Sequence, residues 1–297
     1  MATHNSVTLY GIVGKPPVIM RNSSGEYIRA MIPMATVRGY RSTGNYLDDI
    51  KYDRPTVMSG DPNIIKYMAE LNQGDMVFVK GAITTKNVQK TTTCPHCGAK
   101  NTIPGTLTFV SPIFVEKREQ DKPLEEAVKL VQKKWEISNE VTLVGTVCRE
   151  PSLYVTSSGL ELVTYQLAVN RKFRIKDDAE ESRTDFPWVK SYGANADEDA
   201  KRIKKLSKVL INGRIQTRKR TRKQVCADCG QEYTWTDIVL EIVPYATEYL
   251  SGFRTNEEIA ADEAEKLAKI KEEVFGEDFV VQAETPPDTT GIETYNN

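Results

Sequence analysis

The stretch Asn5-Ser6-Val7-Thr8-Leu9-Tyr10-Gly11 recurs 134 residues later as Asn139-Glu140-Val141-Thr142-Leu143-Val144-Gly145, and this repeat decides the fold. Gly25 matches Gly159 at the same displacement. Further along, the displacement is 132: Gly81 matches Gly213, Pro112 matches Pro244, and two Cys-x-x-Cys pairs match each other. Landmarks that keep their order along the whole copy indicate two copies of one domain.

Each copy predicts the same succession of strands with one short helix. The expected strands are 7–13, 27–37, 52–59, 76–81 and 107–115 in the first copy, and 141–147, 161–169, 188–192, 209–213 and 238–243 in the second. Helical spacing follows the third strand, at 63–71 and 197–206. This is the order of a five-stranded OB barrel, so we expect an all-β chain with short helices and two tandem OB folds. A mixed sandwich would not account for the single helix.

The sequence divides into four expected parts. Residues 1–116 form the first OB-fold domain, 117–138 a helical linker, 139–250 the second OB-fold domain, and 251–297 an acidic helix with a tail. The helix of the last part should begin at Thr255-Asn256-Glu257-Glu258, which resembles a capping box. Beyond Gly276 few apolar residues remain, and the composition is typical of disorder.

Charge is distributed unevenly along the chain, whose net charge is −1. Residues 255–297 contain 12 acidic and 3 basic residues, a charge of −9, which leaves −1 + 9 = +8 for the other 254 residues. A basic body with an acidic tail suits a protein that holds phosphates with one part and repels them with the other. Acids that merely face solvent on a tail helix would give the same numbers.

Several classes of protein are excluded by what the sequence lacks. No apolar run is long enough to span a bilayer, and the first residues do not resemble a secretory signal, so we expect a cytoplasmic, nucleoid-associated protein. The chain has only two histidines, His4 and His96, and no phosphate-cradling glycine loop. No set of residues therefore indicates catalysis, and we expect that the protein is not an enzyme.

The second copy resembles bacterial single-stranded DNA-binding proteins over most of residues 138–245. The motifs that carry the resemblance are Leu167-Ala168-Val169-Asn170-Arg171-Lys172-Phe173, Thr184-Asp185-Phe186-Pro187-Trp188-Val189-Lys190-Ser191-Tyr192-Gly193 and Lys208-Val209-Leu210-Ile211-Asn212-Gly213. In the first copy the aromatic strand becomes Asp53-Arg54-Pro55-Thr56-Val57. The resemblance implies binding and protection of single-stranded DNA in replication, recombination or repair, and tandem members of the family reach four barrels by forming a homodimer. It also implies that the acidic tail recruits replication or repair proteins, although this tail ends in Tyr295-Asn296-Asn297 and departs from the family pattern.

Binding of a single strand requires rings on which bases stack and cations that follow the backbone. The resemblance places stacking rings at Phe173, Phe186 and Tyr192, with Trp188 close by and Tyr40 at the first-copy position of Phe173. Rings on barrel strands also fill interiors, which is the alternative for Trp188 and Tyr192. The basic residues expected to contact phosphates are Arg38, Arg171, Arg214, Arg218, Lys219, Arg220 and Arg222. The first copy offers only Lys86 and Lys90 near this loop, so the second should bind more tightly.

Two matched cysteine pairs, Cys94-Pro95-His96-Cys97 and Cys226-Ala227-Asp228-Cys229, have the spacing of zinc knuckles. Each pair supplies half of a tetrahedral site, so together the four thiolates could hold one Zn²⁺, within one chain or between two chains. His96 should face solvent. A thioredoxin-like redox pair is the alternative, but it requires a strand-to-helix setting, whereas both pairs fall on a strand-to-strand hairpin.

Two other functions remain open from the residues alone. OB barrels with zinc knuckles also occur in RNA-binding and transcription-associated proteins. The first copy could instead be a scaffold that has lost nucleic-acid binding and holds protein partners.

Overall fold

The structure is a computed structural model that describes residues 3–38, 51–118, 122–156, 159–172 and 183–275. The chain separates into two compact units, Met1–Phe253 and Arg254–Asn297. The second unit contains helix α5 (Asn256–Phe275). Its start is the predicted capping box: Thr255 N donates to Glu258 Oε2 at 2.8 Å, and Glu258 N donates to Thr255 Oγ1 at 3.3 Å. Among the described residues, no helix has the length and apolar character needed to cross a membrane.

The first half of the larger unit is a ring of five strands. Its elements are β1 (His4–Val13), β2 (Val18–Arg21), β3 (Tyr27–Val37), β4 (Tyr52–Asp53), β5 (Thr56–Ser59), α1 (Pro62–Ala69), β6 (Met76–Thr93) and β7 (Lys100–Arg118). β1 pairs with β6, β6 with β7, β7 with β5 and β5 with β3. β3 then pairs back onto β1, where Ile12 lies opposite Ala35, and this pairing closes the ring.

The second half repeats the same pairing. It contains α2 (Leu124–Lys133), α3 (Trp135–Ser138), β8 (Asn139–Val147), β9 (Ser152–Val155), β10 (Glu161–Asn170), β11 (Thr184–Asp185), β12 (Trp188–Tyr192), α4 (Ala194–Arg202), β13 (Lys208–Val225) and β14 (Glu232–Ser251). β10 pairs back onto β8, as β3 does onto β1. The linker is helical, as expected, but its helix is divided into α2 and α3, because Lys134 has the non-helical angles φ −102 and ψ 31.

The two halves are joined through their first strands. β1 and β8 pair antiparallel, with Val7 opposite Val141 and Asn5 opposite Leu143. One sheet path therefore continues from one half to the other. Val7, Leu9, Val141 and Leu143 are fully buried in a core cluster that contains residues of both halves, so burial of apolar surface stabilises the joint as well as each ring.

Gly81 and Gly213 occupy equivalent bulges at which the chain bends. At Gly81 an added Cβ would lie 2.3 Å from the carbonyl oxygen of Ser111, and at Gly213 it would lie 2.3 Å from that of Val243. Register shifts occur in the pairing of β6 with β7 and of β13 with β14 at these glycines. The close approach of two backbones explains why the repeat has glycine at both positions.

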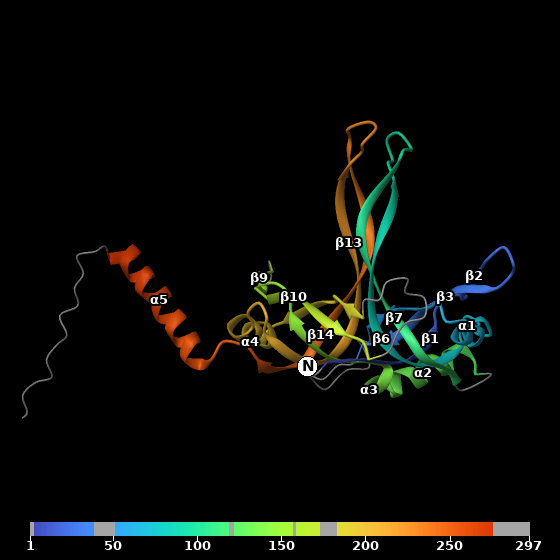
Figure 1. Cartoon of the computed structure of the whole chain (residues 1–297), viewed down its shortest axis with the longest axis horizontal. Helices are drawn as coiled ribbons and strands as arrows, with labels where there is room; N and C mark the ends of the chain where they lie inside the picture. The colour runs from blue at the N-terminus through green and yellow to red at the C-terminus, as the bar shows by residue number, and fades with distance from the viewer. Residues whose placement is uncertain (1–2, 39–50, 119–121, 157–158, 173–182, 276–297) are drawn as a thin grey trace, which may run out of the picture. The chain divides into compact units, whose positions relative to one another are not determined.

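Two long β-hairpins extend beyond the rings and lie side by side (Figure 1). The first arm is residues 84–109 of β6 and β7, and the second arm is residues 216–241 of β13 and β14. The sequence predicted strands ending at 81 and 213, with each cysteine pair on a hairpin between the fourth and fifth strands. The hairpins are present, but the predicted strand ends are wrong: the ladder continues to Thr93 opposite Lys100 and to Val225 opposite Glu232. Alternating side chains along a ladder then determine which polar residues share a face.

Candidate nucleic-acid interface

The basic residues of the second arm are divided between the two faces of its hairpin. Arg218 lies opposite Val239, Arg220 opposite Asp237, and Arg222 opposite Trp235. Because side chains alternate along a strand, these three arginines share one face and Lys219 lies on the other, where it is exposed. The run 218–222 is therefore not one continuous cationic loop, and we do not include Lys219 in the interface that the three arginines form.

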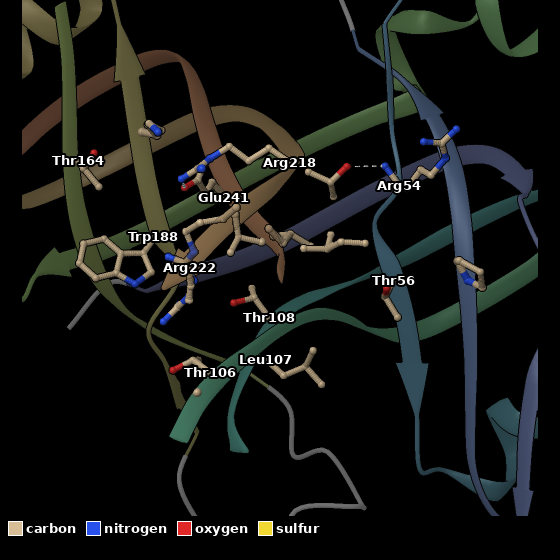
Figure 2. A pocket seen from close by; sticks show the side chains of 18 of the residues that line it. Arg54, Thr56, Thr106, Leu107, Thr108, Thr164, Trp188, Arg218, Arg222 and Glu241 are labelled. Atoms are coloured by element: carbon tan, nitrogen blue, oxygen red, sulfur yellow. Dashed lines mark hydrogen bonds and ion pairs between the residues drawn. The ribbon is translucent and has the colours of Figure 1, made fainter. Parts of the chain in front are cut away.

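The arginine face borders a cleft of about 1210 Å³ within the larger unit. Both halves contribute to its lining: Arg54, Thr56 and Leu107 come from the first, and Trp188, Lys190, Arg218, Arg220, Arg222 and Glu241 from the second. Figure 2 shows Trp188, Arg218, Glu241 and Arg222 close together, with Arg54 and Thr56 across the cleft. The cleft thus combines cations, a large ring and apolar side chains, which is the composition that a single strand requires.

Each arginine of this face already contacts a carboxylate. Arg218 donates to Glu241 from Nε at 2.8 Å and from Nη2 at 2.7 Å, a bidentate pair, and this contact raises the pKa of Arg218. Arg220 and Arg222 both lie near Asp237, at 3.4 and 3.9 Å. Lys90 of the first arm reaches the same carboxylate at 2.8 Å. Although burial raises it, the hydrogen bond and charge of Lys90, followed by Arg220, hold the pKa of Asp237 below its ordinary value.

The predicted aromatic residues have different surroundings. Trp188 is 38% exposed and lines the cleft, with the Arg149 guanidinium 5.9 Å from its ring centre, so it is available for stacking. Phe186 is 43% exposed, outside the lining of the cleft. Tyr192 is half-buried, and Gln216 Nε2 lies 3.3 Å from its hydroxyl. Tyr40 and Phe173 lie outside the described residues.

Three of the predicted phosphate-binding arginines lie against buried carboxylates. Arg38 makes a bidentate pair with Asp53 at 2.9 and 3.0 Å, and Arg171 lies 2.6 Å from Asp185. Arg214 lies 3.9 Å from Asp53, and burial lowers the pKa of this arginine. None of the three lines the cleft. These contacts indicate that the three arginines neutralise buried carboxylates, and we do not include them in the interface.

The same carboxylates join the two halves, a role that the sequence reasoning missed. Asp53 Oδ1 accepts from Thr217 N of the second half at 2.8 Å, and Asp185 Oδ1 accepts from Thr85 N of the first half at 2.8 Å. Both carboxylates are fully buried. The repeat contained a signal for this role. Both copies have the motif Asp-x-Pro, at 53–55 and 185–187, and the threonines that donate to these aspartates, Thr85 and Thr217, are separated by the same 132 residues.

The four cysteines of the matched pairs meet where the two arms end. Their sulfur atoms all lie within 4.8 Å of one another, with Cys94 Sγ 3.8 Å from Cys229 Sγ and Cys97 Sγ 3.7 Å from Cys226 Sγ. The prediction that the pairs converge is confirmed, and they do so within one chain. Contacts between the arms support the cluster: Thr92 Oγ1 lies 2.7 Å from the Tyr233 hydroxyl, and Asn101 Oδ1 accepts from Ala227 N at 3.0 Å. His96 is exposed, as predicted.

The thiols of the cluster differ strongly in acidity. The hydrogen bond from Asn101, followed by the backbone N–H of Cys229, lowers the pKa of Cys226 to about 6. Although the backbone N–H of Ala99 lowers it, the hydrogen bonds of neighbouring cysteines, Cys229 first, together with burial raise the pKa of Cys97 to about 12. Cys226 therefore loses its proton readily, whereas the neighbouring cysteines oppose the loss of the proton from Cys97. A cation among the four sulfurs would remove that opposition.

Comparison with known proteins places the chain in a family. The model of the single-strand binding protein family matches residues 138–243. "Single-stranded DNA-binding protein 3" of Listeria innocua is 32% identical over 114 residues, which cover 38% of this chain and 67% of that protein. The chain belongs to the single-strand binding protein family.

Other members of the family extend the comparison. The single-stranded DNA-binding protein of Streptococcus pneumoniae is 36% identical over 103 residues, 35% of this chain, and the match spans 62% of that relative's length. The crystal structure of the wild-type single-stranded DNA-binding protein from Thermus aquaticus superposes with a TM-score of 0.56 at 16% identity. That match covers 86% of this chain and 97% of the other, so the common fold extends over both halves, beyond the segment matched by the family model.

Proposed function

We propose that this family member binds single-stranded DNA in the cleft between its halves, and that each half is one OB barrel. The observation that carries the proposal is the composition of the cleft: the exposed ring of Trp188 lies beside the arginine face of the second arm. Bases stack on such rings without regard to sequence, while cations attract the backbone. The strand pairing in each half, closed by β3 on β1 and by β10 on β8, supports the assignment of two tandem barrels. Protection of single strands during replication, recombination or repair is the process that this binding serves.

Tryptophan fluorescence tests both the ligand and the place. Oligo-dU should quench fluorescence of the protein, and Trp188→Phe should remove the larger part of the quenching, because the base stacks on this ring. Trp135→Phe is the matched control, since Trp135 packs against an apolar cluster that includes Tyr10, Met76 and Val131, and no residue of that cluster lines the cleft. If Trp188→Phe is quenched as strongly as the unmodified chain, the strand does not bind in the cleft. Oligo-rU of the same length tests the alternative: equal or tighter binding of the RNA would favour an RNA-binding function.

We also propose that Cys94, Cys97, Cys226 and Cys229 bind one Zn²⁺ ion. Four thiolates at about 2.3 Å from a tetrahedral zinc ion are separated by about 3.8 Å. The separations of 3.7 and 3.8 Å across the two pairs fit this geometry. Such an ion would fasten the ends of the arms, and thereby the walls of the cleft, in one arrangement.

Elemental analysis of protein purified under reducing conditions should give about one zinc per chain. Protein without metal would contradict the proposal and favour the redox pair. A mass that halves on chelation would place the ion between chains.

A further inference from the structure

The arginine face of the second arm presents two different electrostatic environments to the cleft. We propose that the Arg218–Glu241 pair is a flat platform on which a base stacks, whereas Lys90, Arg220 and Arg222 around Asp237 form the seat for a phosphate. This inference rests on the proposed binding of single-stranded DNA and assigns the parts of the strand to residues of the cleft.

The Arg218–Glu241 pair is neutral as a unit. The bidentate contacts at 2.7 and 2.8 Å use the Nε–H and one Nη2–H of the guanidinium. A phosphate arriving here would compete with a carboxylate already in place, so it would gain little net charge attraction. The planar guanidinium nevertheless keeps its π-face, and bases stack on arginine planes. Glu241 is buried, so it holds that plane in one orientation and lowers the entropy lost when a base binds.

The position of the pair suits a base that also meets a ring. Trp188 and Glu241 lie on neighbouring strands, since Val189 of β12 pairs with Ile242 of β14. Trp188, Arg218 and Glu241 all line the cleft, and Figure 2 shows them close together. The ring and the guanidinium plane thus form adjoining parts of one surface of the cleft.

The group around Asp237 has the opposite character. Lys90, Arg220 and Arg222 bring three positive charges to one carboxylate, which leaves an excess of two. Lys90 comes from the first arm and the arginines from the second, so the site requires both copies. An anion that approaches this group meets uncompensated positive charge. Arg220 and Arg222 also line the cleft, which makes the site accessible from the binding path.

The first arm provides an internal comparison. At the displacement of 132, Lys86 occupies the place of Arg218 and Phe109 the place of Glu241, while Gly105 stands in place of Asp237. Residues 82–93 and 100–110 contain no aspartate or glutamate. Neither the neutral pair nor the carboxylate-centred group is therefore repeated, and the division of roles is specific to the second arm.

The dependence of affinity on salt distinguishes a base contact from a phosphate contact. For a single strand, each phosphate contact contributes about −0.7 to the slope of log K against log [salt], whereas a stacking contact contributes nothing to it. Binding of oligo-dT by the full chain is measured over a salt series for Arg218→Lys, Arg222→Met and Glu241→Gln. Lys219→Met, on the opposite face, is the matched control.

Arg218→Lys keeps the charge and loses the plane, so affinity should fall about tenfold at every salt concentration with the slope unchanged. Arg222→Met should make the slope shallower by about 0.7. Glu241→Gln frees the charge of Arg218, so the slope should become steeper by about 0.7 and binding at low salt tighter. Lys219→Met should change neither quantity by a comparable amount.

Full affinity in Arg218→Lys, or an unchanged slope in Glu241→Gln, would overturn the platform. An unchanged slope in Arg222→Met would overturn the phosphate seat. These outcomes concern only the division of roles. Failure of the unmodified chain to bind oligo-dT at any salt concentration would instead contradict the proposed function itself. The melting temperature of each variant identifies any that has lost its fold.

Discussion

Replacement of Asp185 by alanine is expected to lower the free energy of unfolding by about 3–5 kcal/mol, the cost of breaking a buried ion pair by removing one partner. Arg171, with only 4% of its side chain exposed, would lose the carboxylate that lies 2.6 Å from its Nε. The N–H of Thr85, which joins the halves through Asp185 Oδ1, would lose its acceptor as well. Urea unfolding measures the change.

The control for this substitution is Asp197→Ala. Asp197 pairs with Lys201 on the exposed face of α4, where both side chains are about half exposed, and removal of such a pair changes stability by less than about 1 kcal/mol. If the two variants lose similar amounts of stability, the buried carboxylates do not join the halves in the way the structure indicates.

The second large effect is expected at the four-cysteine cluster. Cys226→Ser should reduce the zinc content from about one ion per chain to almost none, because a structural zinc site needs all four ligands. The free energy of metal binding contributes directly to the folding of the segments that it holds. The ends of the arms should therefore become sensitive to protease, while the rings, which have their own apolar core, stay folded.

Cys148→Ser serves as the matched control for that substitution. Cys148 follows β8 directly, is half-buried and is not one of the clustered cysteines. Its replacement should leave both the zinc content and the resistance of the arms to protease unchanged. Full zinc content in Cys226→Ser would show that the cluster does not bind the ion as proposed.

Local pattern and the repeat were sufficient to predict the strand order. Alternation along 7–13 and 141–147 identified β1 and β8, and the match between copies transferred each boundary from one half to the other. Convergence of the cysteines also followed, because equivalent positions in two related domains can meet about an axis of approximate symmetry. That the ion is zinc stays a prediction.

The arms were harder to predict because their outgoing strands, residues 84–93 and 216–225, are mostly polar on both faces. The sequence Thr91-Thr92-Thr93 and the run 218–223 have the composition of loops, although β-branched threonine favours strands. Their ladder holds because the hairpins pack on each other through Lys90, Thr92 and Tyr233, contacts between residues more than a hundred positions apart. The local sequence of either hairpin does not indicate a contact with a hairpin so distant along the chain.

The arginines show the same limit at the level of single residues. Arg38 and Arg218 are equally basic in the sequence, but Arg38 faces buried Asp53 and Arg218 lines the cleft beside Glu241. Each carboxylate comes from another strand, so its effect on the cation appears only once the strands are placed. The fold thus decides which positive charges reach a ligand.

The central claim is that the cleft takes a single strand, and competition between two forms of DNA tests it most directly. Labelled oligo-dT of about 30 nucleotides, long enough for two barrels at about 4–16 nucleotides each, is displaced from the full chain by unlabelled single strand or by duplex at one fixed salt concentration. We expect the single strand to compete at much lower concentration, because the bases of a duplex cannot reach Trp188. Equal or better competition by the duplex would contradict it.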